Sequence, residues 1–85
     1  MNNEEEGNKC TDLDTFLANP TAGYTELYLS WKRIGPEGGV AIGQSLQTNT
    51  SLLKLYLIAN NLGPEGGVAI GQSLQTNNTL QRLHL

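Results

Sequence analysis

A phrase of 15 residues occurs twice in this chain and restricts the folds open to it. It runs from Gly35 to Asn49 and again, unchanged, from Gly63 to Asn77, an offset of 28 residues. The same offset carries Leu27-Tyr28-Leu29 onto Leu55-Tyr56-Leu57. A fixed period of about 20 to 50 residues indicates a solenoid, because one unit cannot bury its apolar side alone. The sequence therefore predicts a repeat protein.

Each period begins with a segment that alternates polar and apolar residues. Residues 26–30 and 54–58 both show this pattern, and residues 82–85 begin a third copy. Such alternation predicts half-buried strands whose leucines point inward. Strands that share one direction and are separated by helical segments pair in parallel.

The doubled phrase predicts the helix of each repeat. Pro36 and Pro64 suit the first helical position. A spacing of four residues then defines the face expected to lie on the sheet, formed by Gly38, Ile42 and Leu46 and by Gly66, Ile70 and Leu74. We expect Gly38 and Gly66 to let each helix approach the strand layer closely.

The residues before the repeats divide into two segments. Residues 1–10 are mostly polar and charged, a composition that predicts a disordered acidic tail. Residues 11–23 predict a capping helix and turn, with the helix from about Asp12 to Ala18 and its apolar face on Leu13, Phe16 and Leu17. The repeats then occupy residues 24–85, divided as 27–54, 55–82 and the start of a third strand at 83–85.

Charge and cysteine content argue against several functions. The net charge is −3, and the acidic residues gather before residue 24, so the repeats are nearly neutral. They lack the single-sign patch that nucleic acid or a membrane surface requires. Cys10 is the only cysteine and is expected to be a reduced surface thiol. Because the N-terminal residues contain no apolar run of the kind found in a signal peptide, we predict a cytoplasmic protein.

No residue pattern predicts catalysis, a metal or a cofactor. Residues 38–45 approach the phosphate-loop spacing, but Gln44 occupies the lysine position and the copy at 66–73 shows that the repeat explains the pattern. His84 is the only histidine, so no metal set accompanies it. Neither Ser45 nor Ser73 has a candidate base. We therefore expect no enzyme activity and no cofactor.

The second repeat resembles a known family. Its apolar and asparagine positions, Leu52, Leu55, Leu57, Asn60, Leu62, Gly66, Ile70, Leu74, Asn77 and Leu80, resemble the 28-residue, helix-bearing leucine-rich repeat of the ribonuclease-inhibitor class. Similar repeats occur in NOD-like immune receptors and Ran GTPase-activating proteins. The resemblance implies a short right-handed α/β solenoid, with three parallel strands on a concave face and three helices on a convex face. It also implies that the side chain of Asn60 binds backbone groups of neighbouring coils.

In the resembling family the concave face binds partners. Alternation places Glu26, Tyr28, Ser30, Lys54, Tyr56, Ile58, Arg82 and His84 on that face. Parallel register aligns positions 28, 56 and 84 as a Tyr-Tyr-His stripe beside a Glu-Lys-Arg row. Aromatic residues with charged rims suit protein recognition. The same stripe also serves as a cross-strand ladder that stabilises the sheet, and the two interpretations are compatible.

The first repeat departs from the pattern at its strand-to-helix turn. Trp31, Lys32 and Arg33 stand where the second repeat has Ala59, Asn60 and Asn61. Either terminal repeats are simply atypical, or these three residues form a contact surface, with Trp31 part of the binding site.

These observations predict a non-catalytic protein-protein interaction module that uses the concave strand face and whose partner is a protein. One alternative is a fragment of a GTPase-activating or immune-sensor leucine-rich-repeat protein, in which Arg33 would stabilise charge. A second is a structural protein that forms a homo-oligomer through its C-terminal edge, because an unpaired edge strand invites pairing with another chain.

Overall fold

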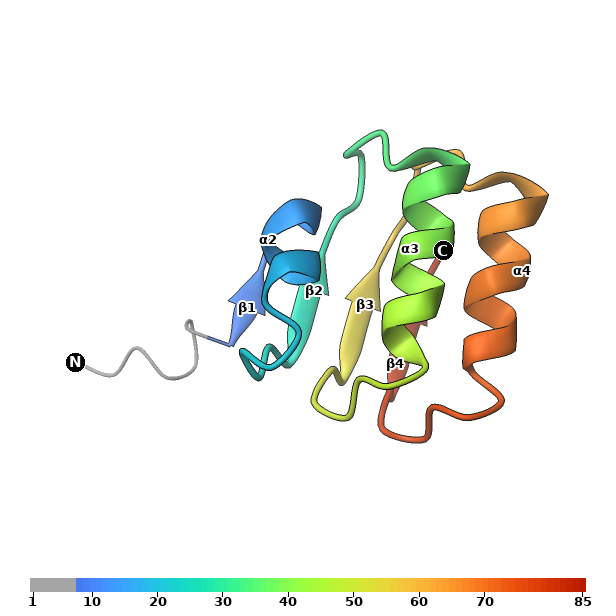
Figure 1. Cartoon of the computed structure of the whole chain (residues 1–85). Coiled ribbons are helices and arrows are strands. Elements are labelled where there is room, and N and C mark those ends of the chain that lie inside the picture. Colours follow the sequence, from blue (N-terminus) through green and yellow to red (C-terminus); the bar gives the residue numbers. More distant parts are fainter. Residues whose placement is uncertain (1–7) are drawn as a thin grey trace.

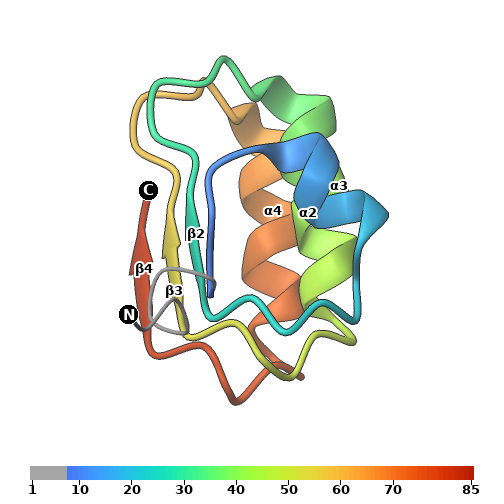
Figure 2. The same cartoon turned by 90° about the vertical axis from the view of Figure 1, so that its left-hand side faces the viewer.

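The computed structural model describes residues 8–85, and short strands alternate with helices along them (Figure 1). The strands form one layer and the helices lie on one side of it (Figure 2). In chain order the elements are β1 (Lys9–Cys10), α2 (Leu13–Ala18), β2 (Glu26–Tyr28), α3 (Gly35–Leu46), β3 (Lys54–Tyr56), α4 (Gly63–Ser73) and β4 (Arg82–His84). Within the described part of the chain, no helix is long and apolar enough to span a membrane.

The sheet is parallel throughout, as predicted, in the order β1-β2-β3-β4. Neighbouring strands pair without any shift beyond the 28-residue period, since Leu27 lies beside Leu55 and Leu55 beside Leu83. Pairing also continues past the strand ends, because the Leu29 N–H donates to the Tyr56 carbonyl at 2.9 Å. The repeat period therefore sets the register of the whole sheet.

Strand β1 corrects the prediction of three strands. Lys9 pairs with Glu26 and Cys10 with Leu27, which makes a fourth strand. The backbone N–H groups of Thr25 and Glu26 both donate to the Asn8 carbonyl, at 2.8 and 3.1 Å. The predicted tail at 1–10 is thus wrong for Lys9 and Cys10, while residues 1–7 lie outside the described part. A two-residue strand is too short to show the alternation that predicted the others.

Cys10 also differs from its predicted place at the surface. It pairs with Leu27, whose side chain is fully buried, and it is itself only 4 % exposed. The Cys10 thiol donates to the Asp12 carbonyl at 3.3 Å. Because its strand caps the edge of the core, the thiol acts as a small apolar core residue.

The core lies between the sheet and the helices. The inward leucines of the strands, Leu27, Leu29, Leu55 and Leu57, are at most 1 % exposed. The capping helix α2 adds Phe16, also buried, while Leu13 and Leu17 pack against the cluster half-buried. Asp12 caps α2 by accepting from the Thr15 N–H at 2.9 Å. Burying each large apolar side chain stabilises the fold by about 1.5–3 kcal/mol.

The predicted helix face is largely confirmed. Ile42, Leu46 and Ile70 are buried, as expected. Leu74 is the exception, because α4 ends at Ser73 and the Leu74 side chain is 40 % exposed. Its counterpart Leu46 ends α3, which has α4 beside it, whereas no described segment lies beyond α4 (Figure 1).

Glycines bring α3 and α4 together, rather than bringing each helix onto the strands as predicted. A Cβ atom at Gly43 would lie 2.6 Å from the Ala69 carbonyl carbon, and one at Gly39 would lie 2.8 Å from the Gly66 Cα. Real Cβ atoms do not approach backbone so closely, so only glycine fits at these two positions. The two helices therefore pack backbone to backbone.

Candidate functional site

An aromatic ladder crosses the face of the sheet opposite the helices, which we call the open face. Tyr28, Tyr56 and His84 occupy adjacent register positions on β2, β3 and β4. The two tyrosine rings stack with centroids 4.8 Å apart and planes 2° apart, and the His84 ring lies 4.9 Å from Tyr56 at 43°. The predicted stripe is thus present as a continuous row of neighbouring aromatic rings.

A charged row runs beside the ladder. Parallel register places Lys9, Glu26, Lys54 and Arg82 next to one another across the four strands. Lys54 Nζ lies 3.7 Å from Glu26 Oε2, and the Lys9 ammonium lies 5.9 Å from the centre of the Tyr28 ring. The sequence prediction contained Glu26, Lys54 and Arg82 but missed Lys9, because β1 itself was missed.

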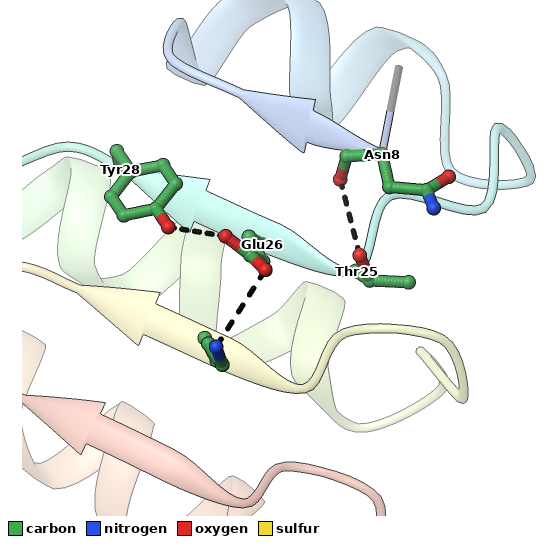
Figure 3. Close-up of polar contacts among 5 residues, drawn as sticks. Asn8, Thr25, Glu26 and Tyr28 are labelled. Atoms are coloured by element: carbon green, nitrogen blue, oxygen red, sulfur yellow. Dashed lines mark hydrogen bonds and ion pairs between the residues drawn. The ribbon is translucent and has the colours of Figure 1, made fainter. Parts of the chain in front are cut away.

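Glu26 is the centre of the polar contacts on the open face (Figure 3). The Tyr28 hydroxyl donates to Glu26 Oε1. This hydrogen bond, followed by the desolvation of the phenol, raises the pKa of Tyr28 to about 12. The same hydrogen bond, aided by Lys54 and Lys9, lowers the pKa of Glu26. Near neutral pH Glu26 is therefore an ionised carboxylate already engaged by its neighbours.

Two more predicted site residues follow the strands on the open face. Ser30 lies two residues beyond Tyr28 and is half-buried, whereas Ile58 lies two residues beyond Tyr56 and is 43 % exposed. The structure thus brings the predicted open-face residues together in three rows: the charged row, the ladder, and Ser30 with Ile58.

The turn after β2 has an unusual backbone. Trp31 and Arg33 adopt positive φ angles of 63° and 55°, as do their counterparts Ala59 and Asn61 in the next coil. Asparagine tolerates this conformation, but for a bulky residue such as tryptophan it is a strained one. The Trp31 side chain is 79 % exposed, so burial against the described residues does not offset this strain.

Asn60 holds the two turns together, as the resemblance implied. Its side chain is 2 % exposed. Its Oδ1 accepts from the backbone N–H groups of Lys32 and Ile34 at 2.7 and 3.2 Å, and its Nδ2 donates to the carbonyls of Leu29 and Leu57 at 2.7 and 3.0 Å. Asn60 is therefore structural and not available to a partner.

Two further asparagines, Asn49 and Asn77, also close turns. Asn49 Oδ1 accepts from the Ser51 and Leu52 N–H groups at 2.9 and 2.7 Å. Asn77 Nδ2 donates across to the carbonyls of Leu46 and Asn49 at 2.8 and 3.0 Å. Both are engaged in the stacking of coils.

A second surface of note was not predicted and lies on α4. A Cβ atom at Gly67 or Gly71 would meet nothing within 4 Å, although the equivalent glycines Gly39 and Gly43 are covered by α4. Nearby, Val68 is 56 % exposed and lines a shallow hollow with Pro64, Glu65, Ala69 and Gln72. The identity of the two phrases was the available signal, because α4 carries the same residues that form the covered face of α3.

The described residues contain no group of three or more histidine, cysteine or carboxylate side chains placed to hold a metal ion.

Comparison with protein families identifies a repeat family. A family model described as Leucine Rich repeat matches residues 25–43 and 48–71, just over half of the chain. No curated protein and no solved structure matches the chain.

Proposed function

We propose that this chain, which belongs to the leucine-rich repeat family, is a non-catalytic protein-binding module that uses its open face. Leucine-rich repeats are generally protein-binding modules and are typically non-catalytic. The observation that carries the assignment to the open face is the stacked ladder of Tyr28, Tyr56 and His84.

The ladder has the physical properties of a recognition surface. Its rings are held rigid by stacking, so binding costs little side-chain entropy. Tyr28 and Tyr56 are half-buried and His84 is exposed, which leaves ring surface for a partner. Tyrosine is enriched among the residues that dominate binding energy, and charged residues commonly form the rim. The open face offers both in adjacent rows. The cytoplasmic location and the GTPase-activating and immune-sensor alternatives stay predictions from the sequence.

Substitution of the central ladder residue tests this function. We expect Tyr56→Ala to weaken binding of peptides selected from a random library on the immobilised full chain by at least about thirtyfold, the loss of about 2 kcal/mol typical of a hot spot. Gln44→Ala, on the exposed side of α3, is the matched control and should bind like the original chain. Circular dichroism should show that both variants stay folded. Equal binding by Tyr56→Ala and Gln44→Ala would contradict a role for the open face.

The α4 surface supports a second proposed function, self-association. Gly67 and Gly71 leave the backbone of α4 open, and the same glycines on α3 accept a neighbouring helix. Leu74 and Leu85 are 40 % and 61 % exposed on the same coil. Within residues 8–85, β4 pairs only with β3, so its other edge carries unpaired backbone groups.

Sedimentation tests this second function. A homo-oligomer predicts a mass above the 9.2 kDa of one chain, and Gly71→Arg, which places a large charged side chain on the open α4 surface, should restore the monomer. A monomer at high protein concentration would contradict self-association and would leave the proposed role of the open face intact.

A further inference from the structure

We propose that the partner of the open face is an acidic protein segment that carries aromatic or aliphatic residues. This inference rests on the proposed function and adds the chemistry of the partner. It follows from the charge balance of the row beside the ladder.

The charged row is cationic although the chain is acidic. Three of its four members, Lys9, Lys54 and Arg82, are positive, while the chain as a whole carries −3. Its one acidic member, Glu26, forms the only ion pair found within residues 8–85, with Lys54. The other Glu26 oxygen accepts the Tyr28 hydroxyl. With three cations and one carboxylate, the row therefore carries a net charge of +2.

Two of the three cations lie at the two ends of the row. Lys9 is exposed on β1 and Arg82 is exposed on β4. Adjacent strands lie about 4.8 Å apart, so Lys9 and Arg82 are separated by about 14 Å across the sheet. An extended segment advances about 3.3 Å per residue, and a stretch of four to five residues therefore spans the row. Carboxylates spaced along such a segment can reach both cations.

Lys32 and Arg33 do not belong to the charged row, because they lie in the turn after β2. Lys32 instead lies near Asp12. The hydrogen bonds from Thr15 lower the pKa of Asp12, and the charge of Lys32 adds to this effect.

The aromatic ladder defines the apolar part of the partner. It runs parallel to the charged row and two residues further along each strand. Aromatic or aliphatic side chains of the partner would lie on the tyrosine rings while its carboxylates contact the row. A nucleic-acid backbone fits less well, because it carries a negative charge at every nucleotide and cannot avoid Glu26, whereas the carboxylates of a peptide can be spaced to contact only the cations. An acidic protein segment satisfies both rows at once.

A charge-reversal experiment tests the proposal. Random peptides displayed on phage are selected in parallel on the full chain and on Lys54→Glu/Arg82→Glu. We expect peptides from the original chain to be enriched in Asp and Glu together with aromatic or aliphatic residues. The reversed variant should instead enrich Lys and Arg, a change of specificity that a loss of stability does not produce.

Affinity measurements use a pair of variants with the same change of net charge. Lys54→Gln/Arg82→Gln should bind a selected acidic peptide about tenfold more weakly, and added salt should weaken binding by the original chain. Gln44→Glu/Gln47→Glu changes two exposed residues of α3 and its C-terminal end and should bind almost normally. Thermal melting of both variants checks that they are folded.

The outcomes separate this inference from the proposed function. Selected peptides without acidic enrichment, or unchanged selection on the reversed variant, would overturn the inference. If such peptides still bound the Tyr56→Ala variant more weakly than the original chain, the open face would remain the binding site. Only the proposal that the partner is acidic would then be wrong. Tighter binding of a polyuridine oligonucleotide than of any selected peptide would also overturn the acidic partner.

Discussion

Replacing Asn60 by alanine is expected to lower the free energy of unfolding by about 3–5 kcal/mol, because the buried side chain makes four hydrogen bonds to backbone groups. Two of those groups are N–H donors of one turn and two are carbonyls of neighbouring coils. Alanine leaves them without a partner in a place where the asparagine is only 2 % exposed. Small domains have total stabilities of about 5–15 kcal/mol, so this loss is a large fraction of the whole.

Urea denaturation followed by circular dichroism measures this loss. Asn61→Gly is the matched control, because Asn61 is exposed and its φ of 52° suits glycine. We expect the control to stay within about 0.5 kcal/mol of the original chain. An Asn60→Ala variant as stable as this control would show that the side chain does not hold the coils together.

Two glycines in identical sequence contexts are expected to respond to alanine with opposite sign. Gly43→Ala places a Cβ atom 2.6 Å from the Ala69 backbone, which forces α3 and α4 apart and should cost about 1–3 kcal/mol. Gly71→Ala places a Cβ atom in open space and removes a helix-breaking glycine, which should stabilise the chain by about 1 kcal/mol. The two variants should therefore differ by about 2–4 kcal/mol.

Thermal or urea unfolding of the two variants provides the measurement. Each variant is the control for the other, because the residues flanking Gly43 and Gly71 are the same. Helix propensity alone predicts stabilisation in both. Stabilisation by both substitutions would contradict the close packing of α3 on α4.

Much of the fold follows from the sequence because it is local and repeated. Alternation at residues 26–30 and 54–58 predicts the strands, and the 28-residue period predicts their register. The stacking of Tyr28 on Tyr56 then requires only those two facts. The bonds of Asn60 were implied by the resemblance to the family.

The parts that sequence reasoning missed depend on long-range contacts. Strand β1 is held by the Asn8 carbonyl and by pairing with β2, and neither contact leaves a local pattern. The burial of Cys10 follows from β1 and was missed with it. Leu46 and Leu74 occupy equal positions in one phrase, yet only Leu46 is buried. Which copy is covered depends on its neighbours in space.

The doubled phrase therefore has two roles. In α3 it forms a packed interface with α4, and in α4 it forms an open surface with exposed Val68. The residues that carry the proposed binding function lie outside the phrase, on the strands. Their strongest feature, the cationic row with Lys9, could not be seen until β1 placed Lys9 beside Glu26.

The central claim, that the open face binds the partner, is tested most directly by amide chemical-shift mapping with a selected peptide. We predict that the shifted amides belong to β2, β3 and β4 and to the residues just after them, including Ser30 and Ile58. The helices α3 and α4 should change little. Shifts concentrated on α4, around Val68 and Gly71, with an unchanged Tyr56, would contradict the claim.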